Sequence, residues 1–166
     1  MKADKIYLVG FMAAGKTTVA RALAQRLGWR VEDIDDLIEG RERRTVAEIF
    51  AREGEPYFRA VERQALRGLL PVRHVVVATG GGTFVDPDNR AAINADGASV
   101  WLDVPFETVL DRLPSGSRRP LAADRAQMAL LYDARRLAYQ QAHVRLDASV
   151  AHAQELVERL LEWLER

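Results

Sequence analysis

Near its amino end the chain reads Gly10-Phe11-Met12-Ala13-Ala14-Gly15-Lys16-Thr17, after the apolar run Ile6-Tyr7-Leu8-Val9 and before a helical pattern from Thr18 to Leu27. An ordinary strand-to-helix turn is the alternative, but the segment fits G-x-x-x-x-G-K-[ST] in the strand–loop–helix context of a phosphate-binding loop. Backbone N–H groups at a helix N-terminus bind phosphate oxygens, and the helix dipole favours negative charge there. The segment therefore predicts a nucleotide-phosphate site, in which Lys16 reaches the β- and γ-phosphates and the Thr17 hydroxyl binds Mg²⁺.

Composition narrows the class of protein. The 166 residues, 48% hydrophobic and 29% charged, predict one globular domain over 1–166. Lys+Arg and Asp+Glu both number 24, so charge offers no argument for a nucleic-acid or membrane partner. The absence of cysteine excludes disulfides, thiolate zinc sites and Cys nucleophiles. With no long apolar run and no signal-peptide pattern, we expect a cytoplasmic protein.

Short apolar runs alternate with helical patterns along the chain. They predict strands at 6–9, 29–31, 74–78, 98–103 and 144–146, and helices at 18–27, 37–41, 46–53, 57–70, 88–94, 105–113, 125–142 and 151–165. Thr45 and Glu48 form a capping-box pattern at the start of the third helix, and Gly54 ends it. This alternation predicts an α/β fold with a doubly wound parallel sheet and ligands at the carboxyl ends of its strands.

Two carboxylates stand at the end of the second predicted strand. Asp33 and Asp35 project to the same side if the chain is still extended there. The alternative is capping of a helix that begins near Asp36. Beside a phosphate loop, we favour a role for these carboxylates near Mg²⁺ and an acceptor hydroxyl.

Glycines and arginines supply the remaining candidates. Gly80, Gly81 and Gly82 follow the central apolar strand, where backbone N–H groups can approach a second ligand closely. Arg59 and Glu62 share a helix face, so a surface ion pair is the default and a Glu62-oriented fork for a carboxylate is the alternative. The Pro/Ser/Gly-rich loop flanked by Arg112, Arg118 and Arg119 is either a linker or a phosphoryl-transfer lid.

Together these motifs resemble the shikimate kinase family across nearly the whole chain. The resemblance rests on Gly-Phe-Met-x-Ala-Gly-Lys-Thr at 10–17, Asp33-x-Asp35 with Leu37-Ile38-Glu39, Ile49-Phe50-x-x-x-Gly54-Glu55-x-x-Phe58-Arg59-x-x-Glu62, Gly80-Gly81-Gly82, Arg119-Pro120-Leu121, and Arg135 four residues before Tyr139. It implies the three-layer, adenylate-kinase-like P-loop kinase fold, with a five-stranded parallel sheet, a substrate-binding helical region at about 33–62 and a lid at about 112–124. It also implies transfer of the γ-phosphoryl group of ATP to the 3-hydroxyl of shikimate, in aromatic amino-acid biosynthesis. We expect a monomer.

The resemblance also implies a role for each matching residue. Lys16 contacts the transferring group, Asp35 holds the acceptor hydroxyl and takes its proton, and Arg119 closes from the lid. Mg²⁺ belongs to Thr17 and, through water, to Asp33. The implied nucleotide-binding set is Ala13, Ala14, Gly15, Lys16, Thr17, Thr18, Arg112 and Arg119, with Arg112 against adenine. The implied shikimate-binding set is Asp35, Arg59, Gly80, Gly81, Gly82 and Arg135, with Arg59 and Arg135 on the carboxylate.

Two positions depart from the family pattern. Ala13 stands where the family usually has Gly, and its β-carbon restricts the loop. The family's second adenine-side Arg has no match near Ser149, and His152 is a candidate replacement. Other small-metabolite kinases, of gluconate or of nucleoside monophosphates, are the nearest alternatives. A non-catalytic nucleotide-binding switch is a further alternative, although it has no need of the acceptor-side residues.

Overall fold

The computed structural model describes residues 3–113, 122–149 and 151–166. Within these ranges the strands are β1 (Lys5–Val9), β2 (Arg30–Asp33), β3 (Val75–Ala78), β4 (Ala98–Asp103) and β5 (Val144–Asp147). The α-helices are α1 (Lys16–Leu27), α2 (Ile34–Glu42), α3 (Val46–Glu53), α4 (Glu55–Leu69), α5 (Pro87–Asp96), α6 (Phe106–Arg112), α7 (Ala122–Tyr139) and α8 (Ala153–Glu165), and η1 (Thr83–Val85) is a 3₁₀ turn.

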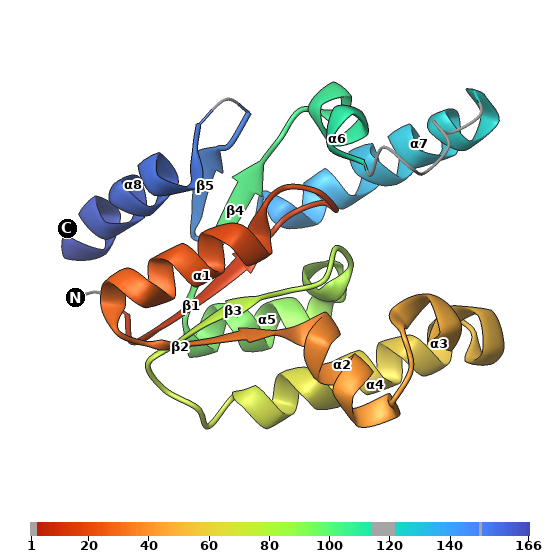
Figure 1. The fold of residues 1–166 in the computed structure, drawn as a ribbon, viewed down its shortest axis with the longest axis horizontal. Helices are drawn as coiled ribbons and strands as arrows, with labels where there is room; N and C mark the ends of the chain where they lie inside the picture. The colour runs from red at the N-terminus through yellow and green to blue at the C-terminus, as the bar shows by residue number, and fades with distance from the viewer. Residues whose placement is uncertain (1–2, 114–121, 150) are drawn as a thin grey trace.

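The described strands form one parallel sheet in the order β2-β3-β1-β4-β5. Helices α1 and α8 pack against each other on one face, and α5 lies behind the sheet on the other (Figure 1). This is the predicted three-layer α/β architecture. Because the strands are parallel, the phosphate loop after β1, Asp33 in β2 and the glycines after β3 all meet at one edge of the sheet.

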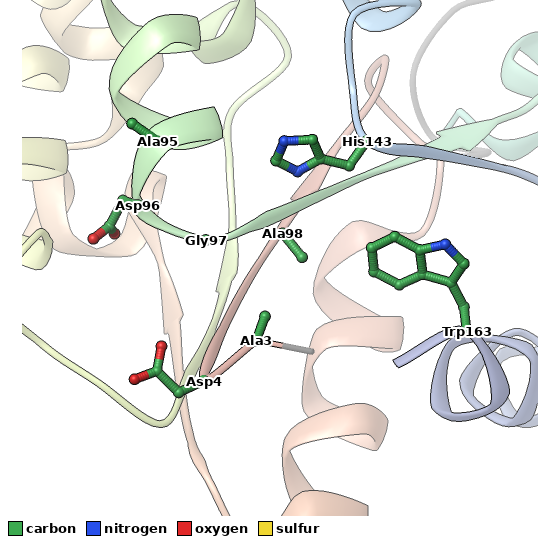
Figure 2. A pocket seen from close by; sticks show the side chains of 8 residues that line it. All are labelled: Ala3, Asp4, Ala95, Asp96, Gly97, Ala98, His143 and Trp163. Atoms are coloured by element: carbon green, nitrogen blue, oxygen red, sulfur yellow. The ribbon is translucent and has the colours of Figure 1, made fainter. Parts of the chain in front are cut away.

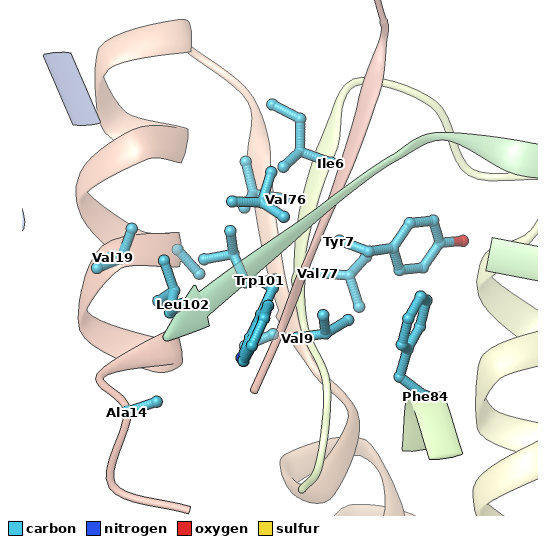
Figure 3. Close-up of a cluster of buried hydrophobic side chains, with 14 of the residues drawn as sticks. Ile6, Tyr7, Val9, Ala14, Val19, Val76, Val77, Phe84, Trp101 and Leu102 are labelled. Carbon is cyan, nitrogen blue, oxygen red and sulfur yellow. The ribbon is translucent and has the colours of Figure 1, made fainter. Parts of the chain in front are cut away.

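The three central strands form the core. Every residue of β1, β3 and β4 is buried, as expected for parallel strands covered on both faces. Figure 3 shows Tyr7 and Phe84 packing on one side of the sheet and Val19 of α1 beside Leu102 on the other. Each such side chain contributes about 1.5–3 kcal/mol of burial free energy, so this core fixes the strand ends that carry the candidate site.

The predicted elements agree with the structure apart from their ends, and one difference affects the site. The spacing of Asp33 and Asp35 fits either a chain still extended at Asp35 or a cap for a helix near Asp36; the structure has the cap, and α2 begins earlier, at Ile34. The reason is that the Asp33 carboxylate accepts a hydrogen bond from the Asp36 N–H and so caps the helix. Asp35 therefore lies in the first helical turn. The capping box of Thr45 and Glu48 is present as predicted.

A charged group lies at the opposite, amino-terminal edge of the sheet. Lys5 is fully buried and its ammonium lies 2.7 Å from an Asp96 carboxylate oxygen, which also accepts from the Tyr7 hydroxyl at 2.6 Å. A hollow of about 450 Å³ lies beside it, with Asp4 and Asp96 on one side and the rings of His143 and Trp163 on the other (Figure 2).

None of the helices in the described ranges has the length and apolar character needed to cross a membrane.

Candidate active site

The phosphate loop leaves β1 at Val9 and enters α1 at Lys16. Gly15 precedes the helix at φ 93°, a left-handed conformation that glycine adopts without strain. In this described segment no side chain caps the helix and no acidic residue lies in its first turn. The first N–H groups of α1 are therefore available for an anion. Ala13 also adopts a left-handed conformation, at φ 59°.

Lys16 is held inside the loop. Its ammonium donates hydrogen bonds to the carbonyl oxygens of Gly10 at 2.6 Å and Phe11 at 3.0 Å. Burial, with the charge of Arg135 and against the opposing charges of Asp35 and Asp33, lowers the pKa of Lys16 to about 8. A phosphate bound at the N–H groups beside it would place negative charge next to this ammonium and favour its charged form.

Thr17 lies next to Asp33, as the metal prediction requires. The Thr17 hydroxyl donates to an Asp33 carboxylate oxygen at 2.8 Å, while the other Asp33 oxygen caps α2. A hydroxyl and a carboxylate are oxygen donors of the kind that Mg²⁺ takes together with substrate phosphates. No group of three or more His, Cys, Asp or Glu side chains that could hold a metal occurs in the described residues.

Asp35 faces this loop from the first turn of α2. Burial, with the nearby charges of Asp33 and Glu62 and against the opposing charge of Lys16, raises the pKa of Asp35 to about 6. A carboxylate whose pKa lies near neutrality is suited to accept a proton from a hydroxyl group.

The glycines at 80–82 lie directly against the candidate acceptor-side residues. A β-carbon at Gly80 would lie 3.0 Å from Asp35 Oδ1, and one at Gly81 would lie 2.9 Å from Arg135 Nη1. One at Gly82 would lie 2.5 Å from Arg59 Nη2. A side chain at any of these positions would displace a charged group, so close approach explains the glycines.

Arg59 is not the surface residue that its helical spacing predicts by default. Its Nη1 donates to Glu62 Oε1 at 2.9 Å, and the Glu62 side chain is only 1% exposed. Arg59 is itself half-buried, and Glu55 on the outer side lies 3.4 Å from its Nε. Glu62 therefore orients the Arg59 guanidinium from a buried position, and the carboxylate as its ligand stays a prediction.

Arg135 reaches the same place from α7. Its guanidinium lies over the Phe11 ring, 5.7 Å from the centroid, and beside Gly81. The Tyr139 hydroxyl donates to the Gly81 carbonyl oxygen and so ties this part of α7 to the glycine loop. Sequence reasoning assigned no role to Tyr139, or to Thr83, which bonds both Gly80 and Glu62. Only the four-residue spacing from Arg135 pointed to Tyr139.

A second cavity, of about 420 Å³, opens on the other side of the phosphate loop. Its lining includes Ala13, Ala14, Gly15, Thr18, Arg112 and His152. Arg112 is held in this lining because its guanidinium donates to the carbonyl oxygens of Ala13 at 3.2 Å and Ala148 at 3.3 Å. The structure therefore brings together the predicted nucleotide-side residues, apart from Arg119. Arg119, Arg118 and most of the predicted lid lie outside the described residues.

Comparisons with known proteins cover the phosphate loop and the residues around the glycine loop alike. The shikimate kinase family model matches residues 12–165. A shikimate kinase of Persephonella marina is 38% identical over 94% of this chain and 96% of that relative, and one of Thermosynechococcus vestitus is 43% identical over 96% and 88%. The solved structure of an Acinetobacter baumannii shikimate kinase in complex with shikimate superposes with a TM-score of 0.90 at 34% identity, covering 98% of this chain and 93% of that one.

Proposed function

The chain belongs to the shikimate kinase family, and we propose on this basis that it phosphorylates the 3-hydroxyl of shikimate with ATP. The observation that carries the proposal is the acceptor side. Asp35, Arg135 and Arg59 each lie against one of three consecutive glycines. A nucleotide-binding switch has no need of this second set of charges.

The donor half is the phosphate loop with its adjoining cavity. Phosphate oxygens would replace the loop carbonyls as partners of Lys16 and would bind the first N–H groups of α1. Adenine would occupy the cavity lined by Arg112 and His152, with Ala13, Ala14, Gly15 and Thr18 along the phosphates. Arg112 must then exchange at least one of its carbonyl partners for the ligand.

Mg²⁺ is the metal that the donor set suits. Thr17 would bind it directly and Asp33 through water, because Asp33 already accepts the Thr17 hydroxyl. When bound, it would neutralise charge on the β- and γ-phosphates.

The acceptor half would hold shikimate by its carboxylate and its hydroxyls. Arg59 and Arg135 are two guanidinium groups that can form charge-assisted hydrogen bonds with a carboxylate. Gly80, Gly81 and Gly82 let these charged side chains lie directly against the loop, and the ring would bind beside them. Asp35 would accept the hydroxyl proton as that oxygen bonds to the γ-phosphorus, the bond to the β-phosphate oxygen breaks, and ADP leaves.

Further features stay predictions from the sequence. They are closure by Arg119 from a lid at 112–124, the helical substrate region at 33–62, a single domain, a monomer and a cytoplasmic location. Light scattering of the purified chain tests whether it is a monomer.

Arg119→Ala tests the role of the lid arginine. We expect this variant to lower kcat far more than it changes KM for shikimate.

An ADP-release assay with shikimate, quinate, gluconate and nucleoside monophosphates tests the function. We expect turnover with shikimate far above background ATP hydrolysis, and loss of it in Asp35→Asn and Arg59→Ala. Turnover with gluconate or a nucleotide in place of shikimate would identify a different small-metabolite kinase. ATP binding without turnover on any acceptor would identify a switch.

A further inference from the structure

Thr83, at the start of η1, is a fully buried residue that joins two parts of the acceptor side. Its hydroxyl donates to Glu62 Oε2 at 2.9 Å and accepts from the Gly80 N–H at 2.9 Å. The other Glu62 oxygen accepts from Arg59. A continuous chain of hydrogen bonds therefore runs from the glycine loop through Thr83 and Glu62 to the guanidinium of Arg59.

The direction of this chain is fixed by its ends. The Gly80 N–H can only donate and the Glu62 carboxylate can only accept, so the one hydroxyl hydrogen of Thr83 must point at Glu62. Hydrogen bonds in such a chain polarise one another and are strong when buried. The Thr83 backbone is held as well, because its N–H donates to the Gly80 carbonyl and its own carbonyl accepts from Asn89 at 3.1 Å.

Arg59 has a competing partner. Glu55, whose side chain is 65% exposed, lies 3.4 Å from Arg59 Nε on the solvent side of α4. Glu62 holds the guanidinium on the inner side, against Gly82. Without a donor on its second oxygen, the Glu62 carboxylate is left buried with one hydrogen bond fewer and is free to rotate. Arg59 would then shift toward Glu55 and away from the glycine loop.

We infer that Thr83 is a positioning residue for the acceptor side: its hydroxyl orients Glu62, and through Glu62 it holds Arg59 over the three-glycine loop. The inference rests on the proposed function, since the ligand of Arg59 is taken to be the shikimate carboxylate. Arg59 holds that carboxylate in the ground state and the transition state alike, so the effect should fall on KM for shikimate rather than on kcat. Binding of ATP, on the phosphate loop, should be unaffected.

The test compares Thr83→Val, which removes the hydroxyl at nearly constant volume, with Thr83→Ser, which keeps it. We expect Thr83→Val to raise KM for shikimate about 5- to 20-fold, with KM for ATP and kcat within about twofold of the unchanged chain. In Thr83→Ser, which keeps the hydroxyl, KM for shikimate should lie within about threefold of its value in the unchanged chain. Thr79→Val is the matched control, because Thr79 is also buried but its hydroxyl donates to the Leu8 carbonyl and does not contact Glu62.

Three results would overturn the inference: an unchanged KM for shikimate in Thr83→Val, an equal rise in KM for ATP, or Thr83→Ser as impaired as Thr83→Val. Circular dichroism checks that Thr83→Val is folded. If it is not, Thr83→Ala takes its place, and its KM values are judged by the same criteria. The unchanged chain is measured alongside. Its inactivity with shikimate would refute the proposed function, whereas its activity with no KM change in the variants refutes only the role of Thr83.

Discussion

The Thr17 hydroxyl donates to the Asp33 carboxylate at 2.8 Å, and the same carboxylate caps the helix that carries Asp35. One side chain thus joins the candidate metal site to the start of α2. The two duties use different oxygens of Asp33, so substitutions can separate them.

Asp33→Asn should keep the helix cap and weaken the metal site. Asn caps helices about as well as Asp, so the free energy of unfolding should change little, whereas Asp33→Ala should lose about 1 kcal/mol. Loss of the negative charge should raise the Mg²⁺ concentration needed for half-maximal activity about 10-fold in both variants. Thermal unfolding and Mg²⁺ titrations measure the two effects. An unchanged Mg²⁺ requirement in Asp33→Asn would mean that Asp33 serves only as a cap.

The raised pKa of Asp35 predicts how activity depends on pH. Since the pKa is about 6 in the folded chain, a base at this position is lost to protonation below that pH. We expect kcat/KM for shikimate, at saturating ATP, to fall about tenfold for each pH unit below 6. Measuring kcat/KM at one pH for acceptor substrates whose hydroxyl groups differ in pKa provides a check. A flat profile between pH 5 and 7 would contradict a role for Asp35 ionisation.

The same pKa predicts a stability difference of definite sign. The pKa of Asp35 is higher folded than unfolded, so the folded chain binds more protons between about pH 4 and 6, and stability from this group is lost as pH rises through that window. Asp35→Asn should therefore unfold at a higher temperature than the unchanged chain at pH 8, and the difference should vanish below about pH 4. The exposed neighbour Asp36→Asn is the control: the pKa of Asp36 is raised as well, by slight burial and by Asp33 and Glu39, so its change should have the same sign and be smaller. A less stable Asp35→Asn at pH 8 would show that its charge is well solvated.

Much of this arrangement is readable from the sequence because its parts are local. The phosphate loop, the strands and the cap at Thr45 each depend on residues within one or two turns of each other. Where α2 begins was not readable, because the spacing of Asp33 and Asp35 fits both an extended chain and a helix capped by Asp33. Only the side-chain hydrogen bond to Asp36 decides between them.

The burial of polar side chains was harder to predict from the sequence than the strands and helices. Glu62 and Arg59 have the spacing of an ordinary surface pair, and the resemblance alone marked Arg59 as a ligand. Their burial depends on η1 and the glycine loop, which come some twenty residues later and pack against α4. Thr83 bears no motif of its own, so its contact with Glu62 needed the folded chain.

Ala13→Gly should stabilise the empty protein. Ala13 adopts φ 59°, where a β-carbon costs about 1 kcal/mol, and glycine removes that strain at a smaller entropic cost. We expect the unfolding temperature to rise by about 1–3 °C. Ala14→Gly is the matched control, since Ala14 is buried and lacks a positive φ, and it should lower the unfolding temperature. Equal changes in both variants would refute strain at Ala13.

Lys5→Met tests whether the charged group at the amino-terminal edge serves the fold alone. Lys5 is fully buried, pairs with Asp96 and donates to the Leu69 carbonyl at the end of α4. Methionine fills similar volume but leaves that carbonyl and the Asp96 carboxylate short of a donor, so we expect a loss of about 3 kcal/mol of unfolding free energy. Urea unfolding of this variant measures it.

The double variant Lys5→Met with Asp96→Asn should lose less than the sum of the two single changes, because either single change already removes the one ion pair between Lys5 and Asp96. KM for shikimate should stay unchanged in all three variants, since this edge lies at the other end of the strands from Asp35 and Arg59. A rise in KM for shikimate in a variant that is still folded would instead mean that Lys5 helps to position α4. This helix carries Arg59, and its last residue, Leu69, accepts a hydrogen bond from Lys5.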